Sequence, residues 1–180
     1  MAISLSSSRS STLEPMRKNR FVMQFAYIPG GGDPTELAFA MHTSTIPQIT
    51  YNVIENHRLN EKFFIAGKPT WNDLTSSFYD YIAGTKSTGQ ILYDWSQSIY
   101  NPITGQMFFK SQYTTSATFA QLDPAGGVAR LWNLYYVWPS SVGWGDAVSY
   151  DDDAIAECNV TLKYDYSIKS IDEDTTPATV

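Results

Sequence analysis

The 180-residue sequence has very little cysteine or histidine: one cysteine, Cys158, and two histidines, His42 and His57. A single cysteine excludes a disulfide within the chain, which favours a reducing compartment. The histidines lack metal-ligand spacing, and a nucleophilic pair with Cys158 would need the fold to join distant positions. We therefore predict no metal site, no cofactor and no catalytic residue, and interpret Cys158 as a small core side chain.

Long apolar runs are also absent. No stretch approaches the roughly 20 apolar residues that a membrane-spanning helix needs. The serine-rich start, residues 1–12, contains no apolar segment of the kind that marks a signal peptide. We expect a cytosolic product that does not enter a membrane.

Positive charge is scarce. Twelve lysines and arginines stand against 18 aspartates and glutamates, which gives a formal net charge of −6. Proteins that grip nucleic acid neutralise its phosphates with clustered basic side chains, so this class is not expected. Between Asp146 and Asp174 lie 9 of the 18 acidic residues, which makes the C-terminal part of the chain acidic.

Aromatic residues are plentiful, at 14% of the chain, and they favour strands. Apolar and polar side chains alternate in the last of the predicted strands, with Cys158, Val160 and Leu162 on one face, as expected for a half-buried antiparallel strand. The predicted strands are residues 21–27, 37–41, 48–57, 62–66, 74–81, 114–122, 128–138 and 156–166. Turn residues predict hairpins that join 21–27 to 37–41 and 114–122 to 128–138.

One stretch predicts a helix. Ile91, Leu92, Trp95 and Ile99 form one apolar stripe at helical spacing, Ser87 and Gln90 fit a capping box, and Asn101-Pro102 ends the pattern. Strands before and after a single helix predict a mainly β, α+β fold: an antiparallel β-barrel or sandwich with one packed α-helix. We expect one domain over residues 17–168, between a polar N-terminal tail, 1–16, and an acidic C-terminal tail, 169–180. Contacts with neighbouring copies would order the tails.

Three motifs that suggest ligands have simpler interpretations. Residues 67–70, Gly-Lys-Pro-Thr, lack the leading glycine of a phosphate-binding loop and are interpreted as a turn. The three glycines at 30–32 open no helix after a parallel strand and fit a hairpin tip. Asp151, Asp152 and Asp153 are consecutive without EF-hand spacing, which favours an acidic surface loop over a calcium site.

Three segments together resemble the tail-tube proteins of contractile-tailed bacteriophages. Residues 17–25 resemble the opening strand of the family. Residues 65–75 contain its passage from Ala-Gly through a basic residue to Thr, an aromatic residue and Asp. The third segment joins the Trp-Pro-Ser-Ser-Val-Gly turn at 138–143 to a closing strand that ends in Tyr-Asp-Tyr, at 164–166. The order of these segments across residues 17–167 carries the resemblance.

The resemblance implies a non-enzymatic virion protein made in the cytoplasm of a bacterial host. Subunits would join sheet edges into hexameric rings that stack inside a contractile sheath, around a channel through which DNA is ejected without specific binding. Implied partners are further copies of the chain, the sheath protein, baseplate and tail-terminator proteins, and a tape-measure protein in the channel.

Two sets of charged residues are candidates for roles in such a tube. Arg58, Glu61 and Lys62 form one charged corner and Asp151, Asp152 and Asp153 an acidic one, and their attraction could set the register between rings. Asp73 and Asp80, among small polar neighbours, are candidates for an acidic channel wall that repels DNA.

Two other functions fit the same sequence. One is the inner tube of a type VI-like or extracellular contractile injection system. The other is a carbohydrate-binding or hydrolytic β-sandwich whose aromatic residues line a sugar groove, with paired carboxylates in the hydrolytic case.

Overall fold

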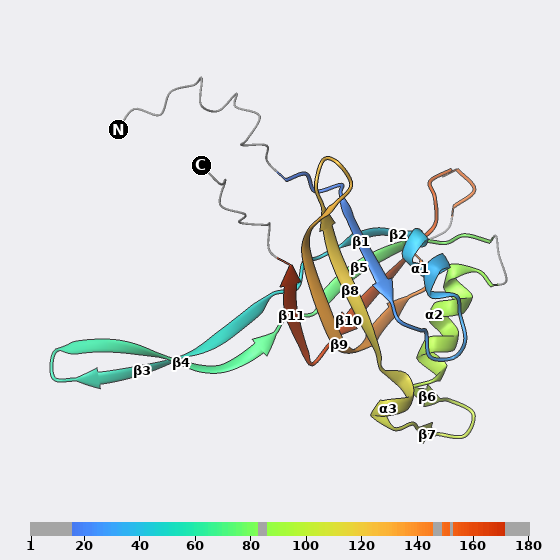
Figure 1. The fold of residues 1–180 in the computed structure, drawn as a ribbon. Coiled ribbons are helices and arrows are strands. Elements are labelled where there is room, and N and C mark those ends of the chain that lie inside the picture. The colour runs from blue at the N-terminus through green and yellow to red at the C-terminus, as the bar shows by residue number, and fades with distance from the viewer. Residues whose placement is uncertain (1–15, 83–85, 146–148, 152, 172–180) are drawn as a thin grey trace.

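β9 (Val128–Gly143) is the strand around which the fold is organised, because it belongs to two antiparallel sheets. The computed structural model describes residues 16–82, 86–145, 149–151 and 153–171. The first part of β9 pairs with β8 (Thr115–Leu122) and β11 (Tyr166–Ile171), and β8 pairs with β1 (Phe21–Phe25). We call β1–β8–β9–β11 the front sheet (Figure 1).

The end of β9 pairs instead with β10 (Glu157–Lys163), followed by β5 (Leu74–Tyr79) and β2 (Met41–Ser44). We call β9–β10–β5–β2 the back sheet. The prediction of a mainly β, antiparallel architecture is confirmed.

β9 changes sheets at Tyr136, whose φ angle is +59°. The register between β8 and β9 shifts here, between Thr115 and Ala117. A left-handed residue in a bulge turns a strand sharply, which redirects the chain from one sheet to the other. The apolar run 131–138 is therefore covered unevenly: Leu134 and Val137 are buried and Tyr136 is half exposed.

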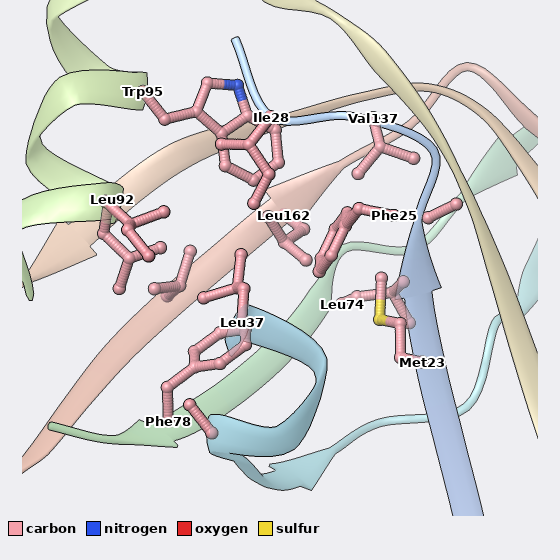
Figure 2. Close-up of a cluster of buried hydrophobic side chains, with 14 of the residues drawn as sticks. Met23, Phe25, Ile28, Leu37, Leu74, Phe78, Leu92, Trp95, Val137 and Leu162 are labelled. Carbon is pink, nitrogen blue, oxygen red and sulfur yellow. The ribbon is translucent and has the colours of Figure 1, made fainter. Parts of the chain in front are cut away.

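The core lies between the sheets and is closed by α2 (Thr88–Gln97) (Figure 2). Alternate residues of β1, β8 and β10 point inward, as their period-two patterns predict. The rings of Phe25 and Trp95 meet edge to face at a centroid distance of 5.6 Å. The largest fully buried side chains are Trp95, Phe25, Phe78, Phe119, Met23, Leu37, Leu74, Ile91, Leu92, Leu134, Leu162 and Val137.

The predicted helix is confirmed as α2, with Ser87 as its N-cap. The Ser87 hydroxyl accepts a hydrogen bond from the Gln90 amide at 3.2 Å, while the Gln90 side chain donates forward to Asp94 Oδ1 at 2.7 Å. The helix ends at Gln97, before the predicted stop, because Tyr100 and Asn101 form β6 (Tyr100–Asn101), which pairs with β7 (Gln106–Met107). The short α3 (Lys110–Tyr113) then leads into β8.

The prediction that residues 37–41 form a strand paired with 21–27 is wrong. These residues lie mainly in α1 (Pro34–Ala40), and β1 pairs with β8 instead. Asp33 caps α1 by accepting a hydrogen bond from the Thr35 amide at 2.8 Å, and Pro34 suits the first helical turn. Asp33-Pro34 is thus a helix start, and the fold contains more than the one helix predicted.

The closing strand is shorter than predicted, and a further strand follows it. Cys158, Val160, Leu162 and Tyr164 are buried, as the alternation predicted, but Tyr166 is part of β11 and exposed. The chain crosses from the back to the front sheet at residues 164–165. β11 runs past residue 168, where the domain was expected to end, and the segments 1–15 and 172–180 lie outside the described residues.

Candidate assembly surfaces

The hairpin of β3 (Ile49–Arg58) and β4 (Glu61–Trp71) projects from one side of the molecule, opposite α1 and α2 (Figure 1). It was predicted as two strands joined by a short charged connection, and its two strands pair with each other alone among the described strands. Large apolar side chains along it are between 44% and 100% exposed: Tyr51, Val53, Ile54, Leu59, Phe63, Phe64 and Ile65. Only the base of the hairpin, at Trp71, packs against the core among the described residues, and a two-stranded hairpin is marginally stable in water by itself.

Both faces of the hairpin are apolar. Residues directly opposite across an antiparallel pair share a face. Ile54 therefore lies beside Ile65 on one face, with Phe63 next along it. Val53 and Phe64 lie on the other face. Covering all of these side chains requires contacts on two sides.

The tip of the hairpin combines charge with an exposed leucine. Arg58 and Glu61 face each other across the turn, and Lys62 Nζ lies 3.3 Å from Glu55 Oε2 in an exposed ion pair. Leu59 is 100% exposed and has a φ angle of +54°. A leucine in this left-handed conformation costs about 1–2 kcal/mol.

The acidic loop lies far from the hairpin tip within one subunit. Asp151 and Asp153 are exposed in the connection between β9 and β10. This connection lies on the side of the molecule opposite the β3–β4 hairpin (Figure 1). Asp152 is outside the described residues. The two charged groups can therefore meet only between copies of the chain.

Asp73 and Asp80 flank β5 of the back sheet and have separate partners. Asp73 Oδ1 lies 2.9 Å from Nζ of Lys163 on β10. Asp80 Oδ1 accepts a hydrogen bond from the Gly89 amide at 3.0 Å, in the first turn of α2. Both carboxylates thus have structural contacts, which sequence patterning does not reveal because their partners are distant in the chain.

β1 and β11 are the two edge strands of the front sheet. Among the described strands, β1 pairs with β8 and β11 pairs with β9, and neither has a second strand partner. Neither strand contains proline. Such edges are templates for pairing with another chain. The sequence could not reveal β1 as an edge, because its partner is far away in the chain.

Residues 16–82, 86–145, 149–151 and 153–171 contain no candidate metal site, because no group of three His, Cys, Asp or Glu side chains in these ranges could hold a metal ion. No helix in the same ranges is long and apolar enough to cross a membrane.

Cys158 is buried, and burial raises the pKa of its thiol, with a smaller contribution from the charge of Asp80.

Solved structures of contractile machines contain the same arrangement of strands. A chain of the sheath–tube complex of PVC, an extracellular contractile injection system, has a TM-score of 0.65 at 20% identity, covering 94% of this chain and 99% of that chain. A chain of the tube-terminating cap of the anti-feeding prophage has a TM-score of 0.67 at 16% identity, covering 93% and 99%.

The SPP1 tail tube has a TM-score of 0.55 at 14% identity, covering 91% of this chain and 83% of that chain. No protein-family model matches the sequence, and the search of curated proteins found no match. This chain has the tail-tube fold.

The segments that carried the sequence resemblance form connected parts of this tail-tube fold. Residues 17–25 include β1, and 65–75 join β4 to β5 at the base of the hairpin. The segment 138–143 is the end of β9, which pairs with β10 of the closing segment. Trp71 and Tyr164, from two different segments, pack together with ring centroids 5.9 Å apart. The tail-tube fold thus places these residues along the back sheet and the hairpin base as well as on β1.

Proposed function

We propose that the chain is the structural, non-enzymatic subunit of a tube in a contractile tail or injection machine. The observation that carries this proposal is the β3–β4 hairpin, which projects from the body with apolar side chains exposed on both faces. Two-stranded hairpins are marginal in water by themselves. Packing against further copies of the chain supplies the missing cover.

The free energy gained by burying the apolar side chains of the hairpin supports assembly through it. Burying one large apolar side chain contributes about 1.5–3 kcal/mol. Several of them on one hairpin therefore outweigh the loss of side-chain freedom on association, which is about 0.5–1.5 kcal/mol for each long side chain. Because both faces are apolar, each hairpin would sit between two neighbours.

Ring closure uses the open edges of the front sheet. A head-to-tail contact repeated by rotation closes into a ring when a whole number of subunit-to-subunit rotations completes one full turn. A closed ring then leaves no strand edge unpaired. We propose hexameric rings, stacked to form a channel, as the subunit's assembled state. The partners would be a sheath protein, baseplate and terminator proteins, and a tape-measure protein, and DNA would pass through the channel in a phage.

Two machines fit this subunit, a phage tail and an extracellular contractile injection system. The TM-scores of 0.65 and 0.67 to the PVC and anti-feeding prophage chains exceed the 0.55 to the SPP1 tail tube, which favours the injection system. A phage tail is the expectation from the sequence motifs. A capsid gene beside the sheath gene would support the phage tail, and a sheath gene without a capsid gene would support the injection system.

Electron microscopy of the purified protein tests the proposal. The unsubstituted chain is expected to form hollow rods or rings in negative stain. Replacing the cross-strand pair by Ile54→Ser and Ile65→Ser, or the pair on the other face by Val53→Ser and Phe64→Ser, is expected to abolish rods. The matched control Ile54→Val with Ile65→Val keeps both faces apolar and is expected to assemble.

Folding must be separated from assembly in this experiment. Each serine variant is expected to have the same denaturant midpoint of unfolding as the unsubstituted chain measured as a monomer, because the substituted side chains lie outside the core. Featureless monomers of the unsubstituted chain that bind glycans would instead support the carbohydrate-binding sandwich and end the tube proposal.

Charge pairing between rings is a separate part of the proposal. Arg58 and Lys62 at the hairpin tip would face Asp151, Asp152 and Asp153 of another copy. Within one subunit the connection between β9 and β10, which contains Asp151 and Asp153, lies on the side opposite the hairpin. Reversing Arg58→Glu and Lys62→Glu should shorten or abolish rods. Adding Asp151→Lys and Asp153→Lys to that variant should restore them. Normal rods from the first variant would rule out this pairing.

A further inference from the structure

We propose that the outward face of the front sheet lines the channel, and that the central rows of this wall carry no charged side chain, so that cargo is not selected by charge. Arg20, which lies opposite Leu122 beyond the end of β1, is the next charged residue on this face. The proposal rests on the tube assembly proposed above. It replaces the expectation of an acidic wall at Asp73 and Asp80, which belong to the back sheet.

The strand register defines which side chains share the outward face. One row crosses the whole front sheet through Gln24, Thr118, Asn133 and Ile168, which lie opposite one another in successive strand pairs. The row beside it faces the core, as the burial of Met23 and Phe119 shows. Because side chains alternate along each strand, the first row points away from the core.

The neighbouring rows on the outward face are also uncharged. Val22 lies opposite Ala120, which in turn lies opposite Leu131. Toward the other end of the sheet, the rings of Tyr135 and Tyr166 stack with centroids 4.7 Å apart. No Asp, Glu, Lys, Arg or His lies in these rows. Beyond Tyr166, Lys110 and Asp165 form an ion pair with no net charge.

The outward face of the back sheet has a different composition. His42 Nδ1 lies 2.9 Å from Glu157 Oε1, and Lys163 lies beside Asp73 at 2.9 Å on the same side. Charged side chains therefore lie on the outward face of the back sheet and are missing from the central rows of the outward face of the front sheet. Exposed positions are normally rich in charged residues, so these uncharged rows are a specific feature of the front sheet.

The outward face of the front sheet is hollowed and polar in part. Small residues in the middle of the outward face leave an open depression of about 510 Å³, lined in part by Ala26, Ser116, Thr118 and Asn133. The polar groups in the wall also bond to each other: Asn133 Nδ2 donates to Ser170 Oγ at 2.6 Å. Side chains satisfied in this way offer fewer bonds to a passing polymer.

The front sheet also has the edges that a closed ring needs. Three antiparallel steps separate β1 from β11, so these edge strands run in opposite directions. β11 of one copy can then pair antiparallel with β1 of the next, and the alternation continues around the ring. A groove of about 260 Å³, lined by Val22 of β1 and by Thr35 and Phe39 of α1, lies beside the β1 edge.

The back sheet is less suited to closing the ring. Its edge strand β2 is short and irregular, with a register shift between Met41 and Thr43. Its other edge, the end of β9, contains Pro139, which cannot donate a backbone hydrogen bond. Natural sheets blunt their edges with these devices. The front sheet is thus the one whose outward face would surround the channel.

An uncharged channel wall affects what the tube can carry. A charge-free wall neither attracts nor repels a polyanion, and it treats polypeptides of either net charge alike. Cargo choice would then depend on the proteins at the tube ends. Interactions with such a wall would also be insensitive to ionic strength, unlike those of an acidic channel.

Cysteine accessibility in assembled tubes tests this assignment. In a Cys158→Ala background, Gln24→Cys and Ala26→Cys each place one thiol on the outward face of the front sheet. In tubes, a small neutral maleimide is expected to react with the thiol. A maleimide attached to a long polyethylene glycol chain is expected to react at least tenfold more slowly in tubes than with disassembled subunits. Reaction with both reagents would put this face outside the tube, and reaction with neither would bury it in an interface. Either result overturns the assignment.

The same thiols report the charge of the wall. In tubes, a small cationic and a small anionic methanethiosulfonate are each allowed to react with the thiol. The ratio of their reaction rates is expected to lie within about threefold of the same ratio at a free thiol. Adding Thr118→Asp beside Gln24→Cys should shift that ratio at least several-fold toward the cation. A strong cation preference without this substitution would show an acidic wall. Failure of the unsubstituted chain to form tubes would overturn the proposed function itself, which keeps the two failures distinct.

Discussion

The indole N–H of Trp95 donates a hydrogen bond to the carbonyl oxygen of Tyr113 at 2.9 Å. Trp95 is fully buried on α2, and Tyr113 ends α3 just before β8 begins. This bond therefore joins the helix that closes the core to the segment that returns the chain to the front sheet. Stability and the position of β8 depend on the same side chain.

Trp95→Phe is expected to lower the free energy of unfolding by about 2–3 kcal/mol, since it leaves a cavity and an unpaired carbonyl group. Chemical denaturation of the monomer measures this loss. The control is Trp144→Phe, at a half-exposed ring that packs on Tyr93. It should change stability by less than about 1 kcal/mol. Equal effects at the two positions would contradict the role of Trp95.

Gly30 and Gly31 form a matched pair for testing the turn between β1 and α1. Both have a positive φ angle, +89° and +82°. A Cβ at Gly30 would lie 2.5 Å from the backbone oxygen of Asp94 on α2, whereas a Cβ at Gly31 meets nothing within 4 Å. We expect Gly31→Ala to cost about 1 kcal/mol, from backbone conformation alone. Gly30→Ala should cost at least about 2 kcal/mol more, because rigid backbone must move, and thermal unfolding of the two variants gives the difference.

Leu59→Asn should affect the subunit and the tube in opposite directions. Asparagine tolerates a left-handed backbone better than leucine, so the hairpin tip becomes more stable and its amide hydrogens exchange more slowly. Loss of a buried leucine contact, worth about 1.5–3 kcal/mol, should raise the concentration needed for tube assembly about tenfold or more. Leu59→Met, which stays apolar, is the control. Unchanged assembly of Leu59→Asn would show that the leucine contacts no other copy.

The stability of the subunit is expected to fall at alkaline pH through Cys158. Burial raises the pKa of its thiol above the ordinary value of 9.0. Below pH 9 the folded and unfolded chains both keep the proton, so this group adds no pH dependence. As the pH rises past 9, the unfolded chain loses its proton first, and unfolding becomes more favourable until the folded thiol also ionises.

Denaturation midpoints between pH 8 and pH 11 measure the fall in stability. Burial also raises the pKa of Tyr164, whose ordinary value is 10.0, and this adds a loss of the same sign at higher pH. Cys158→Ala should therefore remove the earlier part of the decline and leave the later part. An identical pH profile in that variant would contradict the contribution of Cys158.

Local patterns in the sequence were sufficient for several elements. The capping signal at Ser87 and the stripe of Ile91, Leu92 and Trp95 predicted α2, because a helix is fixed by neighbours in the chain. The hairpin of β8 and β9 followed from two alternating runs around a glycine-rich turn. Pairings between distant segments, such as β1 with β8, leave no such local signal.

The sequence missed α1 because an apolar run of this length fits either a strand or a helix turn, and Asp33-Pro34 was interpreted as part of a hairpin. Sequence patterning also did not reveal the partners of two carboxylates. Asp73 and Asp80 each contact an element distant in the chain, Lys163 and the start of α2.

By itself the sequence determined the antiparallel β class, the position of α2, the burial of Cys158 and the charged tip of the hairpin, because each depends on residues close together in the chain. Only the tertiary structure decided that β9 serves two sheets, that the hairpin extends with both faces exposed, and that the central rows on the outward face of the front sheet lack charged side chains. These features arise when distant strands are aligned in register, since only then do side chains from Gln24 to Ile168 share one surface.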